Sequence, residues 1–165
     1  MCRQIARVNR AEAALLLRLK ALAGDSEPEV TGACFSGILS VEGPTALPFV
    51  SPFLASADPD VVAEAALALG LARLPDAVSL IVDRYRIERD ASLASVLLTA
   101  LAVSHQDAAG SFLLSIVESD GATKAAAAIE AVVSAGGLTE EMRAKFAAAA
   151  KRNSDPKVAS AAARL

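Results

Sequence analysis

Aromatic residues are scarce in this chain. Its 165 residues include no Trp and one Tyr, Tyr85, and the aromatic share is 4%. More than half of the residues are apolar, mostly Ala, Leu and Val, and they do not alternate with polar residues as they would in half-buried strands. Runs such as AEAALALGLA, at 63–72, consist of strong helix formers. The composition therefore predicts one all-α domain in which small side chains let the helices pack closely.

Cysteine and histidine are nearly absent too. Cys2 and Cys34 are the two cysteines and His105 is the single histidine, so the sequence predicts neither a disulfide framework nor a zinc site. His105 lies in the segment AVSHQDAAG, where we expect a turn, and no nucleophile or orienting group accompanies it in a recognisable arrangement. We therefore expect no metal, no cofactor and no catalytic residue, and a reduced, cytoplasmic location.

Long hydrophobic runs are missing as well. Arg18 and Lys20 interrupt the apolar run near the N-terminus, and no cleavage site of a signal peptide follows it. The longest stretch without a charged residue is 91–106, sixteen residues that include three Ser, a Thr, a His and a Gln. Such a stretch is short and polar for a membrane span. The sequence therefore predicts a protein without a membrane contact.

The net charge of −3 is unevenly distributed. Residues 24–120 carry four basic and fourteen acidic side chains, whereas residues 1–23 carry five basic and one acidic and residues 121–165 carry seven basic and four acidic. An acidic middle repels the phosphates of nucleic acids. We therefore expect that nucleic acid is not a partner.

The most informative pattern in the chain is an internal repeat. A shift of 31 residues aligns 28–50 with 59–81 without a gap and superposes two prolines and seven small or apolar residues. A shift of 32 finds a third copy at 91–113, in which Ala and Asp replace the two prolines. A fourth, longer copy opens at 119–123, and a fifth opens at 154–158 and supplies one helix. Residues 24–165 thus contain about four and a half repeats.

Each copy begins as a helix would begin. The motifs SEPEV, ADPDV and SDPKV place Asp or Ser ahead of a Pro, so that the polar side chain caps the helix and Pro occupies its first position. The following Val and the residues four, seven and eight positions later form one apolar stripe. Pro44 and Pro75 begin a second helix, which Pro48 and Pro52 are expected to kink or delay in the first copy. A helix–turn–helix unit of this size buries its apolar face only against its neighbours, so we predict a right-handed α-solenoid.

The segment ADPDVVAEAALALGLARLPDAVSLI, with its D-P-x-V start and its second Leu-Pro, resembles the short HEAT-like repeats named after the phycobilisome lyases. The resemblance extends over residues 24–165 and implies a solenoid whose second helices line the concave face. It implies no particular activity, because such repeats serve adaptors, lyases and regulatory subunits alike. Repeats of this class often carry Arg inside the first helix, where this chain has Ala, Glu, Thr or Gly.

A helix over about residues 3–23 precedes the repeats. Its apolar face is expected to contain Ile5, Val8, Leu15, Leu19 and Leu22, and another face carries three arginines, at positions 3, 7 and 10. The simpler interpretation is a capping helix that covers the open end of the first unit and has a solvated basic face. The alternative is a basic contact for an acidic partner or a membrane surface.

The stretch DRYRIERD, at 83–90, is the most polar in the chain and falls in the second helix of the second unit. Tyr and Arg often anchor protein interfaces, so Arg84, Tyr85 and Glu88 are the candidate partner-binding residues. Small side chains in the neighbouring units, such as Ser115, would leave room for a partner. The alternative is a solvated helix end in which Arg84 and Glu88 form an ion pair at i, i+4.

Three classes of function fit the predicted fold. We favour a non-catalytic protein-interaction or scaffolding module, acting as a monomer or weak homodimer, because solenoids offer long curved surfaces. A bilin-lyase-type enzyme subunit is the first alternative, although no catalytic residue of a lyase can be matched onto this chain. A nucleic-acid-binding protein of the kind found among HEAT-like DNA glycosylases ranks last, because the chain lacks Trp and has an acidic middle.

Overall fold

The computed structural model describes residues 10–165, and this part of the chain contains helices and no strand. The elements, in chain order, are α2 (Arg10–Ala23), α3 (Pro28–Glu42), η1 (Gly43–Ala46), α4 (Leu47–Val50), η2 (Ser51–Ala55), α5 (Pro59–Leu71), α6 (Pro75–Ile87), α7 (Ala91–Ser104), α8 (Asp107–Ser119), α9 (Ala122–Ala135), α10 (Glu140–Lys151) and α11 (Pro156–Ala162). The predicted all-helical solenoid is confirmed.

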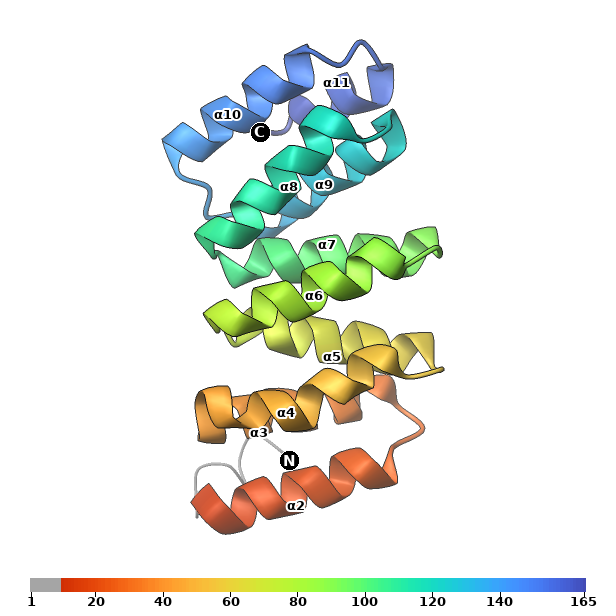
Figure 1. Cartoon of the computed structure of the whole chain (residues 1–165), viewed down its shortest axis with the longest axis vertical. Helices are drawn as coiled ribbons and strands as arrows, with labels where there is room; N and C mark the ends of the chain where they lie inside the picture. The colour runs from red at the N-terminus through yellow and green to blue at the C-terminus, as the bar shows by residue number, and fades with distance from the viewer. Residues whose placement is uncertain (1–9) are drawn as a thin grey trace.

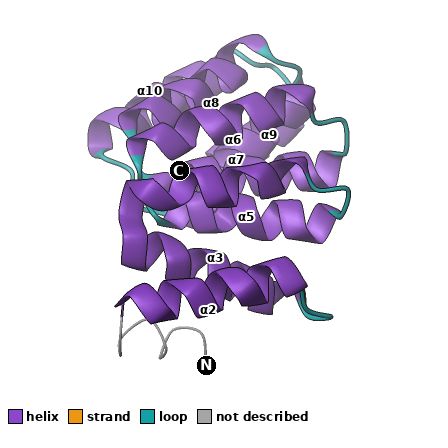
Figure 2. Ribbon diagram, turned by 60° about the horizontal axis from the view of Figure 1, so that its bottom comes forward, coloured by secondary structure: helices purple, strands orange, loops and turns teal. Residues whose placement is uncertain are grey.

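The helices form two layers of a stack (Figures 1 and 2). The first helices of the repeats, α3, α5, α7, α9 and α11, pack successively against one another and lie behind the second helices in the view of Figure 1. The second helices lie in front, and neighbours such as α6 and α8 touch much less than the first helices do. Between two of the second helices, α6 and α8, lies a hollow that contains the candidate site.

Three copies carry the Pro-containing motif, and in two of them the helix starts as the motif predicts. Asp58 accepts a hydrogen bond of 3.0 Å from the amide of Asp60, and Asp155 accepts one of 2.8 Å from the amide of Lys157. The first copy differs, because the residue before Pro28 is Glu27, whose side chain makes no capping bond. There Asp25 accepts from the amide of Glu27, which orders the turn ahead of the helix. The predicted Asp or Ser cap is therefore confirmed for two copies and wrong for the first.

The second helix of the first unit is interrupted, as the prolines predict. It runs through η1, α4 and η2 instead of forming one regular helix, because Pro48 and Pro52 lack the amide that a helix interior needs. The run Pro28–Ala55 is long and apolar enough, by length and composition alone, to cross a membrane. In the fold this run is two antiparallel pieces of one repeat, and Phe35, Ile38 and Val50 within it are buried in the core.

Small residues set the spacing of the first-helix layer. A Cβ atom added at Gly70 of α5 would lie 2.2 Å from the backbone oxygen of Ala100 in α7, so the two helices meet backbone to backbone. Alanines 65, 66 and 68 of α5 are buried beside this contact, and Leu69 is completely buried. The core is therefore continuous from unit to unit, as expected for a repeat protein.

The helix that precedes the repeats has the opposite orientation from the one predicted. Its buried residues are Ala13, Ala14, Leu17 and Ala21, and Leu17 packs where α3 has Gly37. The face formed by Leu15, Leu16, Leu19 and Leu22, termed here the leucine face, is 53–66% exposed. The prediction that leucines 15, 19 and 22 form the packed side is wrong, because close approach to α3 selects the small residues of α2 instead. Ile5, Val8, Arg3 and Arg7 lie outside the described residues.

Candidate functional site

The three predicted partner-binding residues lie together at the C-terminal end of α6, but they are largely buried. Tyr85 is 8% exposed, and the side chains of Arg84 and Glu88 are 18% and 9% exposed. Although the stretch DRYRIERD is rich in polar residues, these three side chains do not form an exposed polar face. Whether a partner contacts any of the three stays a prediction.

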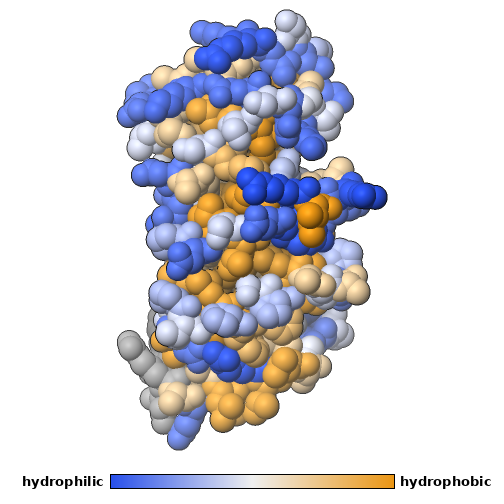
Figure 3. Space-filling model, in the orientation of Figure 1, coloured by the Kyte–Doolittle hydropathy of each residue, from blue (hydrophilic) through white to orange (hydrophobic). Residues whose placement is uncertain are grey.

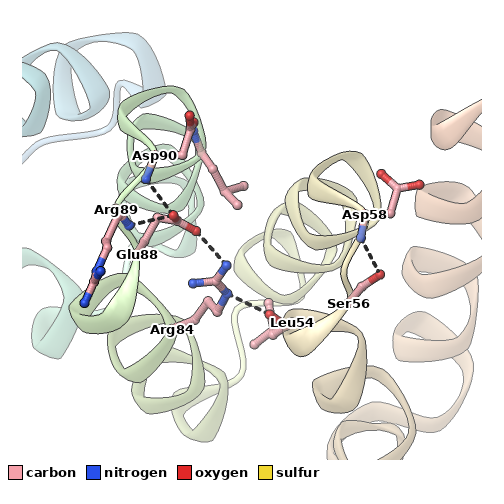
Figure 4. A network of polar contacts seen from close by, with 8 residues as sticks. Leu54, Ser56, Asp58, Arg84, Glu88, Arg89 and Asp90 are labelled. Atoms are coloured by element: carbon pink, nitrogen blue, oxygen red, sulfur yellow. Dashed lines mark hydrogen bonds and ion pairs between the residues drawn. The ribbon is translucent and has the colours of Figure 1, made fainter.

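Arg84 joins the first and second units (Figure 4). Its Nε donates a hydrogen bond of 2.8 Å to the backbone oxygen of Leu54, in the last turn of η2, where helix carbonyls lack partners. Its Nη2 lies 2.6 Å from a carboxylate oxygen of Glu88, which is the ion pair that the i, i+4 spacing predicts. The guanidinium of Arg84 thus binds a helix-end carbonyl of the preceding unit and a carboxylate of its own unit.

Glu88 extends the same network into the third unit. Its Oε1 accepts hydrogen bonds of 2.6 and 2.7 Å from the amides of Arg89 and Asp90, directly ahead of α7, and Asp90 in turn caps α7 by accepting from the amide of Leu93. The amide of Asp90, followed by that of Arg89 and by the charge of Arg84, lowers the pKa of Glu88 below its ordinary 4.5, although burial opposes this shift. The network therefore holds three consecutive units in register.

A hollow of about 300 Å³ lies beside this network, between the C-terminal ends of α6 and α8. Its lining includes Tyr85, Arg86, Glu88, Phe112, Ser115 and Lys124. The rings of Tyr85 and Phe112 meet edge to face with centroids 5.8 Å apart, and the guanidinium of Arg86 lies over Phe112 at 6.0 Å. The hollow thus has an aromatic floor, while Ser115, which the sequence predicted would leave room for a partner, forms part of its wall.

Charges of both signs surround the hollow. Arg86 forms an exposed ion pair of 3.3 Å with Asp83, and Lys124 lies 3.8 Å from Asp120. Exposed pairs of this kind contribute about 0–1 kcal/mol, so both cations are free to turn toward a partner. Burial, and secondarily the charge of Asp120, raises the pKa of Tyr85, which keeps the phenol neutral at physiological pH. Figure 3 shows apolar surface between polar side chains on this side of the molecule.

Sequence reasoning missed Arg86, Phe112 and Lys124 as a group. They come from α6, α8 and α9, and no spacing in the chain places them together. For Phe112 the sequence offered only a weak indication. It is the one aromatic residue of the third repeat, and the shift of 32 aligns it with an apolar position of the second helix.

Two further residues considered from the sequence, His105 and Cys34, lie away from this hollow. His105 is exposed in the turn after α7, as predicted, with its ring against Gly137. Cys34 is buried in the core. No group of three His, Cys, Asp or Glu side chains between residues 10 and 165 is placed to hold a metal ion.

Helix pairs stacked in two layers define an α-solenoid of repeats. The chain belongs to the HEAT-repeat family: the family model for HEAT repeats matches residues 15–102, which is more than half of the chain. HEAT repeats generally mediate protein–protein interaction and are typically non-catalytic. Comparison with characterised proteins and with solved structures finds no match.

Proposed function

We propose that this protein is a non-catalytic binding module that holds a partner protein across the second helices α6 and α8. The hollow between these helices carries the proposal. It combines an aromatic floor, made by Tyr85 and Phe112, with a rim of exposed charges. Buried aromatic contacts surrounded by polar residues are the usual composition of an interface centre.

The partner in this proposal inserts an apolar side chain against Phe112 and places charged groups near Arg86 and Lys124. A segment with an acidic residue next to a Leu, Met or aromatic residue fits this pattern, because the ion pairs of both cations on the rim are exposed to solvent. Arg84 and Glu88 act behind the surface by fixing the end of α6. Tyr85 contributes the edge of its ring to the floor.

The test begins with capture of the partner from a native lysate and continues with its affinity for matched variants. Ser115→Arg fills the hollow from an exposed position of α8 without removing a packed side chain. Ser95→Arg makes the same change in charge and bulk at an exposed position of α7, in the first-helix layer. Both variants are expected to melt like the wild type.

We expect Ser115→Arg to weaken binding by about 2 kcal/mol or more, roughly thirtyfold, as blocking of an anchor pocket does. Ser95→Arg should bind as the wild type does. If Ser115→Arg binds normally, or if Ser95→Arg is the variant that loses the partner, the second-helix surface is not the binding site.

A further inference from the structure

The floor of the hollow between α6 and α8 contains a buried hydroxyl group, that of Tyr85. Tyr85 is 8% exposed, so more than nine-tenths of the residue is buried. Within residues 10–165 its hydroxyl makes no hydrogen bond. Buried Tyr hydroxyls usually have a hydrogen-bond partner, because a polar group left without one costs free energy. The site therefore contains a polar group that no described part of the fold uses.

The hydroxyl of Tyr85 remains open to solvent. Among the side-chain oxygens and nitrogens of the described residues, Glu88 Oε2 is the one that is fully buried without a hydrogen bond, and an ion pair with Arg84 holds it instead. The phenol oxygen has no hydrogen bond either, yet it is not among the fully buried atoms. Tyr85 lines the hollow, so the hollow gives a partner access to this hydroxyl.

The phenol is available as a hydrogen-bond donor. Burial, and secondarily the charge of Asp120, raises the pKa of Tyr85, so the phenol keeps its proton at physiological pH. Although Asp120 also lines the hollow, no hydrogen bond joins it to the hydroxyl within the described chain. A group that binds here satisfies the proton of Tyr85 only if it offers an acceptor, such as a carbonyl or carboxylate oxygen.

The charges of the lining favour a negatively charged acceptor. Arg86 and Lys124 contribute two cations, and the ion pairs of both are exposed to solvent. Of the two acidic residues in the lining, Glu88 is engaged by two backbone amides and by Arg84. Asp120 is the acid that opposes an incoming carboxylate, but its side chain is 38% exposed and lies 3.8 Å from Lys124, so it is free to turn away.

We propose that the hydroxyl of Tyr85 is the specificity-determining donor of this hollow and donates a hydrogen bond to a side-chain carboxylate of the partner protein. This inference rests on the binding surface proposed above. In the complex Lys124 pairs with the same carboxylate in place of Asp120, and the neighbouring apolar side chain of the partner packs on Phe112. A site that offers a buried donor discriminates strongly against groups that cannot accept from it.

A displayed library of random peptides, selected against the full chain, supplies the probe. Selected peptides whose binding Ser115→Arg blocks are those that occupy the hollow, and they should carry an Asp or Glu beside a Leu, Met or aromatic residue. Tyr85→Phe keeps the ring and removes the hydroxyl, so it should weaken these peptides at least about tenfold. It should melt at or above the wild-type temperature, because the hydroxyl has no partner in the described fold. Ser79→Ala is the matched control: it removes an exposed hydroxyl from the same helix outside the hollow and should bind as the wild type does.

Two further changes test the chemistry of the contact. An Asp→Asn or Glu→Gln change in the peptide should weaken binding to the wild type more than binding to Tyr85→Phe, since the variant has already lost the hydrogen bond. Asp120→Asn should bind the acidic peptide at least as tightly as the wild type, because it removes the opposing charge from the wall. Weaker binding to Asp120→Asn would show that the hollow takes a donor or a cation, and it would overturn the inference.

The remaining outcomes separate this inference from the proposed function. If Ser115→Arg blocks the peptides but Tyr85→Phe binds them normally, the binding surface stands and the role of the hydroxyl is wrong. A lower melting temperature for Tyr85→Phe would overturn the inference too, because the hydroxyl would then serve the fold. If the peptides blocked by Ser115→Arg lack acidic residues, or if it blocks none, the inference fails, while the captured partner still decides the proposed function.

Discussion

Replacing Gly70 by Ala tests the close packing of the first-helix layer. The added Cβ would lie 2.2 Å from the backbone oxygen of Ala100, whereas ordinary contacts begin at 3.4 Å. The two helices would have to separate by more than an ångström, because both the added Cβ and the oxygen of Ala100 are fixed to a helix backbone and cannot rotate away. Overpacking of this kind costs about 1–3 kcal/mol, and a helix clash between backbones lies at the upper end of that range.

Gly70→Ala also stabilises the helix itself, and this gain must be subtracted from the cost of the clash. Ala is favoured over Gly by about 1 kcal/mol inside a helix, so the expected net destabilisation is about 2 kcal/mol. For a chain of this length that corresponds to a decrease in melting temperature of roughly 4–8 °C. Thermal unfolding followed by far-ultraviolet circular dichroism measures it directly.

Gly110→Ala is the matched control for this prediction. Gly110 lies inside α8, and its added Cβ would meet only the terminal methyl of Met142, at 3.1 Å. That methyl belongs to a flexible side chain and can move, so the helix gain should dominate and the melting temperature should stay the same or increase. If Gly70→Ala melts at or above the wild-type temperature, the backbone-to-backbone contact between α5 and α7 is not present in solution.

Three further changes have defined outcomes. Leu69→Asp buries an unpaired charge in the core at a cost of several kcal/mol, so it should abolish the unfolding transition of at least two units; an unchanged melting curve would show that the repeat register is wrong. Glu88→Gln should lower stability at neutral pH, because the lowered pKa of Glu88 stabilises the folded state above pH 4.5. This contribution is lost as pH falls through the folded pKa, so the stability difference between variant and wild type should shrink in acid. A difference that persists unchanged in acid would refute this prediction. Glu64→Gln should raise stability at neutral pH, since burial and two neighbouring carboxylates raise the pKa of Glu64 and penalise its charged form. That advantage should shrink as acidification protonates the wild-type carboxyl, and a variant that is less stable at neutral pH would contradict the assignment.

The repeat made most of the fold predictable. The two aligned prolines of the second unit begin α5 and α6, and the shift of 32 correctly assigned Ala91 and Asp107 to the starts of α7 and α8. These positions could be found because a helix start depends on a few neighbouring residues: a cap, a proline and an apolar stripe. The interruption after α3 was predictable for the same reason, since Pro48 and Pro52 act locally.

The orientation of helices against one another was less predictable. In α2 the rule that large apolar residues face inward failed: Leu17 packs against Gly37 of α3, and the buried side of the helix is otherwise made of alanines. Which side of α2 packs therefore depends on α3, which the pattern within α2 does not show. The role of Arg84 was hidden for a similar reason. Its acceptor, the carbonyl of Leu54, is thirty residues away and approaches only when the two units are stacked.

The partner-binding role of Arg84, Tyr85 and Glu88 stays a prediction, and the structure shows only where these residues lie. The end of α6 borders the hollow through Arg86 and Tyr85, and Tyr85 forms the floor together with Phe112 of α8. Arg84 lies in the network behind the hollow. Sequence composition marks a stretch as polar, but it does not say which of its side chains are used internally.

Amide hydrogen exchange of the free protein and of its complex with the captured partner tests the proposed binding surface most directly. Binding across the hollow predicts new protection in Arg84–Asp90 and in the second half of α8, with little change in α5 and α7. Protection that appears in the first-helix layer, or only in α2, while α6 and α8 exchange as in the free protein, would contradict the proposed function.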